Sequence, residues 1–405
     1  MSFKTSYQHI KALISDEQWE AAKASMVVCA HDFPEYPQLN KLARLLGSLP
    51  RTHLPHFRLA LLGNWTMAQL AQLLELYAYF SDIYLETYLG QYDQYWFELN
   101  QPAPRLQDFK PDAIFLSVHH DAIVSPAPFT EEQGLESHWS NELEKWRGLW
   151  GQGKSVFGAQ IIQANIAVPP DWVFSHAASQ HSWTPKTYLQ SFNARLGQLA
   201  RNAGVGLFDI DALSSNIGKR AWFDNPMWYF SKQLVPLEYL PYLSQQLNNV
   251  ITSLVRGPKK VLILDLDNTL WKGVIGDDGL EGIEIGNGTA AGEAFASFQR
   301  YALTLKGRGI ILAVCSKNEP ATARLPFESH PGMNMKPDDI ACFVANWNPK
   351  SENIRFIAKE LNIGLDACVY IDDNPAERMQ VRDALPMVAV PEIPDDISQV
   401  PQFLS

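Results

Sequence analysis

Residues 261–271 read VLILDLDNTLW, and this stretch decides the fold of the second half of the chain. Its first four residues are all apolar, which is typical of a strand buried on both faces of a parallel sheet. Two aspartates, Asp265 and Asp267, follow directly at the end of that strand. Carboxylates beside an apolar core cost free energy unless a cation shares the site. The stretch therefore predicts a buried strand whose carboxyl end lies at a cation-binding site.

The composition is typical of a globular protein, and the chain is long enough for two domains. The chain has 405 residues, of which 46% are hydrophobic and 19% charged. Its formal net charge of −11 argues against nucleic acids and anionic membranes as partners, because both attract a positive surface. The four cysteines show neither a CxxC pair nor zinc spacing, and no apolar run reaches 18 residues. We expect a soluble cytoplasmic protein with free thiols.

Alternating strand and helix patterns predict two α/β domains after a helical segment over residues 1–50. We expect the first domain over 51–257 and the second over 258–405, because Gly257-Pro258 ends a helical pattern. The predicted strands of the first domain are 57–63, 111–118, 154–162 and 205–211, and its predicted helices are 66–82, 130–153, 184–204 and 240–257. The predicted strands of the second domain are 261–267, 310–318, 340–346 and 367–375, and its predicted helices are 293–309 and 350–364. Strands that alternate with helices in this way predict a parallel, doubly wound sheet in each domain.

Polar residues gather where the predicted strands of the second domain end. The four clusters are Asp265/Asp267/Thr269, Ser316/Lys317/Asn318, Lys350 and Asp372/Asp373. Ligands bind at this edge of an open α/β sheet. Several carboxylates converging there favour a hard divalent cation such as Mg²⁺, while a lysine and hydroxyl groups suit a phosphoryl group. The clusters therefore predict a magnesium-dependent site for phosphoryl chemistry.

The spacing of the first two aspartates suits a two-step displacement. Side chains at positions i and i+2 of a strand point the same way, so Asp265 can attack phosphorus while Asp267 protonates the leaving oxygen. Taken singly, each cluster also fits a helix cap, a turn or a solvated surface. A receiver domain that is phosphorylated on aspartate also has strand-end carboxylates, but it does not explain a DxDxT pattern on the first strand. The order of all four clusters is what favours the phosphoryl-transfer interpretation.

The strings DLDNTLW, CSKN, NPK and IDDNP, in this order, resemble the haloacid dehalogenase (HAD) superfamily, and residues 258–396 resemble its FkbH-like branch. This resemblance implies a capless, Rossmannoid HAD-like domain in which 273–286 (GVIGDDGLEGIEIG) forms a β-hairpin flap. It also implies the role of each site residue. Asp265 matches the nucleophile, which is also a metal ligand, and Asp267 matches the acid/base, which binds the metal through its backbone carbonyl. Asp372 and Asp373 match the acidic Mg²⁺ ligands. The residues that match those binding phosphate or substrate are Thr269, Ser316, Lys317, Asn318 and Lys350.

The resemblance further implies a reaction. The substrate is D-1,3-bisphosphoglycerate, phosphate is released, and the glyceryl group is loaded onto the phosphopantetheine thiol of an acyl carrier protein for polyketide-type biosynthesis. The alternative is a Mg²⁺-dependent phosphohydrolase of a small phosphate ester or acyl phosphate. Cys315 directly precedes Ser316, and we expect it either to carry a thioester, with a pKa depressed by Lys317, or to be a small core residue.

The first domain resembles the SGNH-hydrolase-like part of FkbH-like proteins through LLGNWTM (61–67), YLGQYDQYWFEL (88–99) and FDNPMWYFSKQ (223–233). This resemblance implies an SGNH/flavodoxin-like fold. An SGNH hydrolase needs a serine after the first strand and a late histidine, and this sequence has neither at those places. His119-His120-Asp121 follows a predicted strand. These residues fit either a catalytic dyad that replaces the missing SGNH residues or a pair of histidines that is hydrogen-bonded or exposed at the strand end. We expect a non-catalytic domain that docks the carrier protein or shapes the site.

Overall fold

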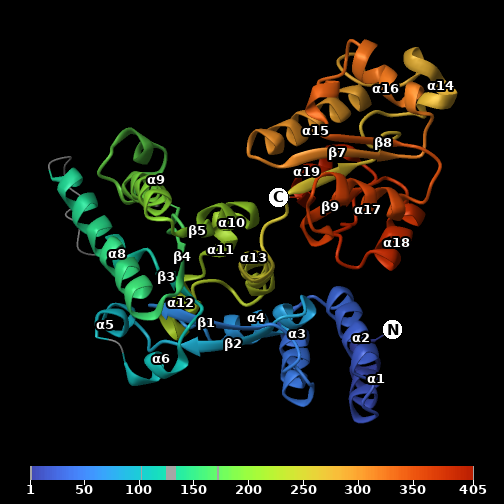
Figure 1. Ribbon diagram of the computed structural model, residues 1–405. Helices are drawn as coiled ribbons and strands as arrows, with labels where there is room; N and C mark the ends of the chain where they lie inside the picture. The colour runs from blue at the N-terminus through green and yellow to red at the C-terminus, as the bar shows by residue number, and fades with distance from the viewer. Residues whose placement is uncertain (1, 102, 125–133, 171–172, 405) are drawn as a thin grey trace. The chain divides into compact units, whose positions relative to one another are not determined.

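The structure is a computed structural model that describes residues 2–101, 103–124, 134–170 and 173–404 (Figure 1). The chain divides into two compact units, residues 1–255 and 256–405. The four cysteines are free thiols. Within the described residues, no helix combines the length and the apolar character needed to cross a bilayer.

The first unit begins with helices and continues as a parallel five-stranded sheet. The initial helices are α1 (Phe3–Ser15), α2 (Trp19–Asp32), α3 (Tyr36–Ala43) and the 3₁₀ helix η1 (Arg44–Ser48). The strands are β1 (His56–Gly63), β2 (Tyr84–Leu89), β3 (Ala113–Ser117), β4 (Gln160–Ala164) and β5 (Gly206–Phe208). They lie in the order β2-β1-β3-β4-β5, which is the flavodoxin-like order with its reversal between β1 and β3.

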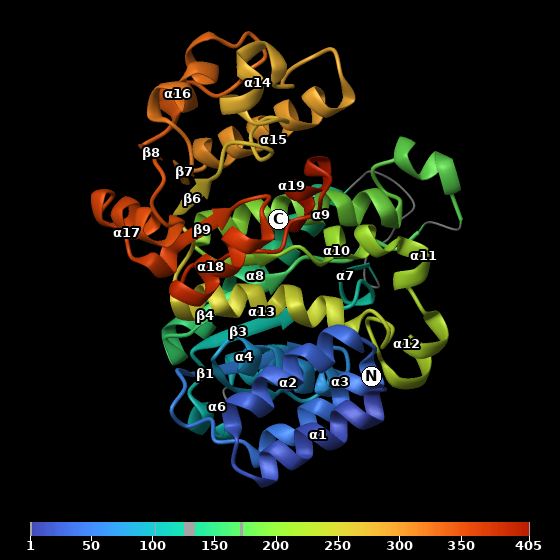
Figure 2. The same ribbon diagram turned by 90° about the vertical axis from the view of Figure 1, so that its right-hand side faces the viewer.

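Helices cover both faces of this sheet (Figures 1 and 2). Leu59 and Leu61 of β1 pack into the core that contains α4 (Ala68–Phe80) and α13 (Leu240–Arg256), while Ala60 and Leu62 pack into the opposite core with α8 (Leu135–Phe157) and α9 (Pro185–Ala203). Alternate side chains of a strand point to opposite faces, so one apolar strand serves both cores. The other helices of the unit are α5 (Tyr95–Asn100), α6 (Pro104–Phe109), α7 (Asp121–Val124), η2 (Ser175–Gln180), α10 (Ile210–Ile217), α11 (Lys219–Trp222) and α12 (Asn225–Ser231).

Three sequence predictions for this unit are wrong in part. Residues 154–157 belong to the end of α8, and the predicted strand begins only at Gln160, after Gly158 ends the helix with a left-handed φ of 64°. β2 was not predicted, because only Leu85 and Tyr88 of its residues are buried and it contains no apolar run. The predicted strand over 205–211 ends at Phe208, since Asp209 caps α10. Residues 130–133 of the predicted helix lie outside the described residues.

The second unit is a parallel four-stranded sheet. Its strands are β6 (Val261–Leu264), β7 (Ile311–Ser316), β8 (Cys342–Ala345) and β9 (Cys368–Ile371), in the order β8-β7-β6-β9. The order reverses between β6 and β9, as in a Rossmann-like sheet. Its helices are α14 (Ile275–Gly282), α15 (Ala290–Gly307), α16 (Pro320–Ser329), α17 (Lys350–Glu360), α18 (Pro375–Ala384), α19 (Val400–Leu404) and the 3₁₀ helices η3 (Pro337–Asp339), η4 (Leu365–Ala367) and η5 (Ile397–Gln399).

The two faces of this sheet carry different helices. Leu262 and Leu264 of β6 pack into the core with α15 and α16, whereas Val261 and Ile263 pack into the core with α17 and α18. The predicted β-hairpin flap over 273–286 is wrong. The segment forms the short helix α14 with a break at Gly279, and one isolated antiparallel bridge, Lys272 to Glu284, closes it.

Candidate active site

Register brings the predicted carboxylates together at the carboxyl edge of the second sheet. Leu264 at the end of β6 pairs with Val314 on one side and with Ile371 on the other. Asp265 therefore follows between Cys315 and Asp372, and its backbone N–H donates to the Ile371 carbonyl at 2.9 Å. These positions continue the α17 face of the strands, so the carboxylates meet the first residue of α17, which is Lys350.

Lys350 lies between two buried carboxylates. Its Nζ donates to Asp265 Oδ1 at 2.7 Å and also to Asp372 Oδ2, and all three side chains are almost fully buried. Burial raises the pKa of Asp265 to about 7, with Lys350 opposing the rise and Asp372 adding to it. Burial lowers the pKa of Lys350, but the two carboxylates outweigh that effect and raise it overall. The lysine is therefore charged and neutralises part of the acidic cluster.

The acidic cluster fits a hard divalent cation. Oxygen atoms of Asp265, Asp372 and Asp373 lie within 4.8 Å of one another. Burial, followed by the charge of Asp372, raises the pKa of Asp373. Lys350 brings one positive charge to a group of three carboxyl side chains. A set of carboxylate oxygens with uncompensated negative charge is the donor set that Mg²⁺ prefers.

Two residues that sequence reasoning missed hold this cluster in place. The Tyr370 hydroxyl donates to Asp372 Oδ2, and Arg378 Nη1 donates to the backbone carbonyls of Asp372 and Asp373 at 2.8 Å each. The backbone N–H of Asn374 donates to Asp372 Oδ1 at 2.8 Å. Tyr370 stands two residues before Asp372, so the two side chains point to the same face of the sheet, and this spacing could have predicted their contact. Arg378 donates hydrogen bonds to backbone carbonyls, and no sequence pattern predicts such a contact.

The carboxylate of Asp267 is not part of the acidic cluster of Asp265, Asp372 and Asp373 and has other partners. Its Oδ1 accepts from the Trp271 indole and the Ile275 backbone, both at 3.0 Å, and its Oδ2 accepts from Asn318 Nδ2 at 2.7 Å. Asp267 is half-buried. The carboxylate oxygens of Asp267 thus have partners within the protein, and Asn318 is one of the residues that orient this aspartate.

The remaining predicted phosphate ligands differ in their surroundings. Thr269 is fully buried, and its hydroxyl accepts from the Asp373 backbone N–H at 3.3 Å, so it ties two strand-end loops together and is closed to substrate. Ser316 ends β7 and is buried beside the site. Lys317 is partly exposed and pairs with Glu377 Oε1 of α18 at 2.5 Å. Among the residues predicted to bind phosphate or substrate, Lys350 and Ser316 have the surroundings that best suit this role.

Cys315 does not have the properties of a reactive thiol, and the prediction of a depressed pKa is wrong. The side chain has no exposed surface and packs in the core with α17. Burial raises its pKa to about 12, against a smaller opposing effect of Lys350. A thiol without thiolate character or access is a poor nucleophile. The structure therefore favours the core-residue interpretation.

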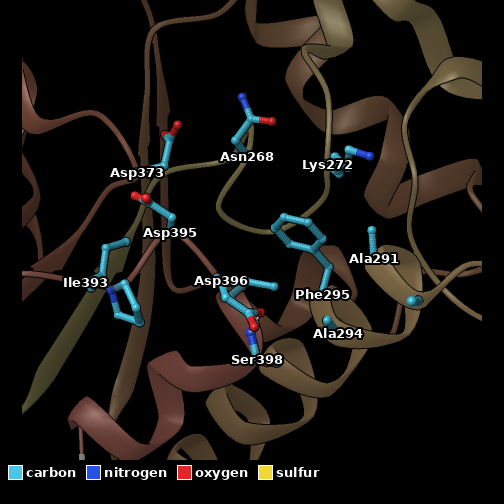
Figure 3. A pocket seen from close by; sticks show the side chains of 13 residues that line it. Asn268, Lys272, Ala291, Ala294, Phe295, Asp373, Ile393, Asp395, Asp396 and Ser398 are labelled. Atoms are coloured by element: carbon cyan, nitrogen blue, oxygen red, sulfur yellow. Dashed lines mark hydrogen bonds between the residues drawn. The ribbon is translucent and has the colours of Figure 1, made fainter.

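A cavity of about 600 Å³ adjoins the cluster at Asp373 (Figure 3). It is lined by Asn268 and Lys272 from the segment after β6, by Phe295 of α15, and by Asp395 and its neighbours. The Lys272 ammonium pairs with Glu284 Oε1 at 2.9 Å. The cavity gives a small molecule room beside the carboxylates.

Comparisons with known proteins agree with this geometry. Residues 58–252 match the family model described as FkbH, N-terminal domain. The chain is 32% identical to the N-terminal part of the protein BF1531 from Bacteroides fragilis, containing a phosphatase domain and solved in complex with Mg, with a TM-score of 0.81 over 91% of this chain and 96% of that one. No curated protein matches the chain.

Two further solved structures show weaker similarity. They are a lipase/acylhydrolase from Enterococcus faecalis (10% identity, TM-score 0.36, 49% of this chain and 97% of that one) and a GDSL-like lipase from Bacteroides thetaiotaomicron (11%, 0.31, 55% and 98%). At these TM-scores the similarity says nothing about activity. The match to the family model, together with the similarity to BF1531 over nearly the whole chain, shows that this chain belongs to the FkbH-like family.

Proposed function

We propose that this protein removes phosphate from D-1,3-bisphosphoglycerate and loads the glyceryl group onto the phosphopantetheine thiol of an acyl carrier protein. The family and the phosphatase domain of the Bacteroides relative support a phosphatase-related function. The single observation that carries the proposal is the buried trio of Asp265, Lys350 and Asp372, with Asp373 beside it. This set combines a nucleophilic carboxylate, a fixed positive charge and oxygen donors for Mg²⁺.

The residues of this chain divide the phosphoryl transfer between them. Asp265 attacks the phosphorus of the phosphate ester, the bond from phosphorus to the substrate oxygen breaks, and Asp267 gives a proton to that leaving oxygen. Trp271, Ile275 and Asn318 hold Asp267 in position for this proton transfer. Water then attacks the aspartyl-phosphate and releases inorganic phosphate, while Asp267 takes a proton from that water.

Asp265, Asp372 and Asp373 are the side chains that would hold Mg²⁺. The bound ion supplies positive charge that offsets the charge of the phosphoryl group. Lys350 supplies a second, permanent positive charge, which remains because two carboxylates raise its pKa. Tyr370 and Arg378 fix the loop that carries Asp372 and Asp373, so the donors are preorganised.

The acyl transfer takes its thiol from the carrier protein, because Cys315 is inaccessible. The pantetheine thiolate attacks the acyl carbon of the acyl phosphate, the carbon–oxygen bond breaks, and phosphate leaves as the thioester forms. The burial of Cys315 equally favours the second candidate, a phosphohydrolase of a small phosphate ester or acyl phosphate, since that reaction needs no thiol.

Mass spectrometry of the carrier protein separates the two candidates. The protein is incubated with Mg²⁺, D-1,3-bisphosphoglycerate and a carrier protein bearing phosphopantetheine. We expect a glyceryl adduct on the pantetheine arm together with phosphate release, and loss of phosphate release in Asp265→Asn. Phosphate release without any adduct would establish the phosphohydrolase instead. The carrier protein with its pantetheine arm, incubated with the substrate and Mg²⁺ but without the enzyme, is the control for non-enzymatic acylation.

A further inference from the structure

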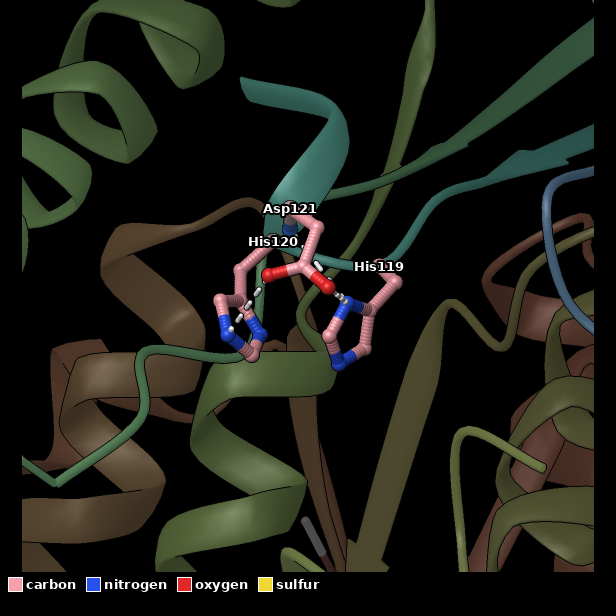
Figure 4. Close-up of side chains that lie close together, drawn as sticks. All are labelled: His119, His120 and Asp121. Carbon is pink, nitrogen blue, oxygen red and sulfur yellow. Dashed lines mark hydrogen bonds and ion pairs between the residues drawn. The ribbon is translucent and has the colours of Figure 1, made fainter. Parts of the chain in front are cut away.

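A second cluster of ligating side chains lies in the first unit, at the carboxyl edge of β3. His119, His120 and Asp121 follow this strand, and Figure 4 shows the three side chains turned toward one another. The sheet order reverses between β1 and β3, and ligands of open α/β sheets bind outside the carboxyl ends of the strands at such a reversal. Asn64, which follows β1, accepts the His119 backbone N–H on its Oδ1 at 2.7 Å and so ties the two strand ends together.

The distances within the cluster suit a coordinated ion. His119 Nδ1 lies 3.2 Å from Asp121 Oδ2, and His120 Nε2 lies 3.4 Å from Asp121 Oδ1. Nitrogen and oxygen ligands about 2.0 Å from a tetrahedral zinc ion lie about 3.3 Å from one another. One ligand atom from each residue falls within a common span of 4.8 Å. The three ligand atoms are therefore close enough together to share one ion.

One ring nitrogen of the cluster is buried without a partner. His119 Nδ1 lies 3.3 Å from the Asp121 backbone nitrogen and 3.2 Å from Asp121 Oδ2, so a hydrogen bond to the carboxylate accounts for this nitrogen. His120 Nδ1 is buried and has no hydrogen-bond partner among the described residues. The contacts within the cluster do not account for that second nitrogen, and a metal ion is one partner that an unprotonated imidazole nitrogen takes.

The surroundings hold the histidines but leave one side open. The His119 ring is buried and stacks on Trp228 with centroids 3.6 Å apart. The side chain of Asp121 is 56% exposed. Three protein ligands and an open side are the arrangement of metal sites that keep a position for water or a small anion, whereas structural zinc sites are closed by four ligands.

We propose that His119, His120 and Asp121 form an open, three-ligand site for a transition metal of the zinc class. Two imidazoles and a carboxylate select such a metal over Mg²⁺, which prefers all-oxygen sites. The site is separate from the acidic cluster of the second unit and does not depend on the proposed reaction there. It gives the first unit a ligand-binding function at the place where the sequence lacks a serine nucleophile.

Cobalt binding tests the proposal, because tetrahedral cobalt with nitrogen ligands absorbs visible light more strongly than octahedral cobalt with oxygen ligands. The full chain is freed of metal and titrated with Co²⁺ and then with Zn²⁺, and bound metal is counted by elemental analysis. Asp265→Asn, which alters the acidic cluster, is expected to keep the strong band. His120→Gln and Asp121→Asn are each expected to weaken binding at least 100-fold, while the exposed control His181→Gln is expected to bind like the original chain.

Folding of each variant is checked by circular dichroism, and phosphate release, which depends on the second unit, is also measured for the His120, Asp121 and His181 variants. Loss of the band in His120→Gln and Asp121→Asn, with folding and phosphate release retained, supports the site. The proposal is overturned if the original chain shows no strong band, or if the two variants bind Co²⁺ as well as His181→Gln does.

Discussion

At the scale of single residues, the pairing of Lys350 with Asp265 and Asp372 is the contact on which the proposed site most depends. It neutralises two buried carboxylates in the metal-free protein, and removing one partner of a buried pair leaves uncompensated charge. We expect Lys350→Ala to lower the free energy of unfolding of the metal-free protein by about 3–5 kcal/mol and to reduce the rate of phosphate release at least about 100-fold. Urea unfolding and a phosphate assay measure the two effects.

The matched control is Lys359→Ala, an exposed lysine of the same helix α17. Its unfolding free energy and activity are expected to stay within about 0.5 kcal/mol and twofold of the original, as for an ordinary surface change. Equal behaviour of the two variants would show that Lys350 is neither paired nor used in catalysis.

Cys315 provides the opposite prediction, since its thiol is buried and protonated. We expect Cys315→Ala to cost about 1 kcal/mol or more through the small cavity it leaves, and to retain both phosphate release and transfer to the carrier protein. Cys342→Ala, in the same core, is the control for the loss of a buried thiol. Loss of transfer in Cys315→Ala alone, with phosphate release intact, would restore the thioester role.

The residues show what sequence reasoning can and cannot reach. Asp265, Lys350 and Asp372 were predicted together because each stands at a strand end, and parallel strands bring their carboxyl ends to one edge. The burial of Thr269 was missed and Cys315 was left open between a thioester and a core residue, because their burial depends on how α17 and the loop after β9 pack over them. Arg378 was missed since its partners are backbone carbonyls, which every residue has.

At the scale of elements, the strands with apolar runs were predicted and the others were not. β6 and β3 are buried at every residue, whereas the edge strand β2 is buried only at Leu85 and Tyr88 and resembles a loop in sequence. The boundary between α8 and β4 was predicted too early in the chain, because residues 154–157 fit either a helix or a strand. Only Gly158, with its left-handed backbone, marks the end of the helix. The resemblance to the HAD superfamily implied a hairpin flap over 273–286, but the segment forms a short helix with a break at Gly279.

Gly63, at the end of β1, allows a close approach that a side chain would block. A Cβ there would lie 1.8 Å from the Ser117 carbonyl oxygen of β3. We expect Gly63→Ala to push the two strand ends apart and to destabilise the first unit by about 1–3 kcal/mol in urea unfolding. Gly47→Ala, where no atom lies within 4 Å of the added carbon, is the control and should have little effect. Equal stability of the two variants would contradict this packing of β1 on β3.

At the scale of the whole molecule, the division into two units predicts a local response to magnesium. The acidic cluster belongs entirely to the second unit, so Mg²⁺ stabilises the segments that carry it. In hydrogen exchange followed by mass spectrometry, we expect Mg²⁺ to slow exchange around residues 261–273 and 368–378 and to leave β1–β5 unchanged. Protection spread evenly over both units, or confined to the first, would contradict the assignment.

The most direct test of the central claim is a crystal of the protein soaked with Mn²⁺, which replaces Mg²⁺ and scatters anomalously. The account predicts an anomalous difference peak within coordination distance of Asp265, Asp372 and Asp373, and no such peak in a crystal of Asp372→Asn. A Mn²⁺-soaked crystal of the original chain with no peak among these carboxylates, and with the Lys350 pairs unchanged, would contradict it.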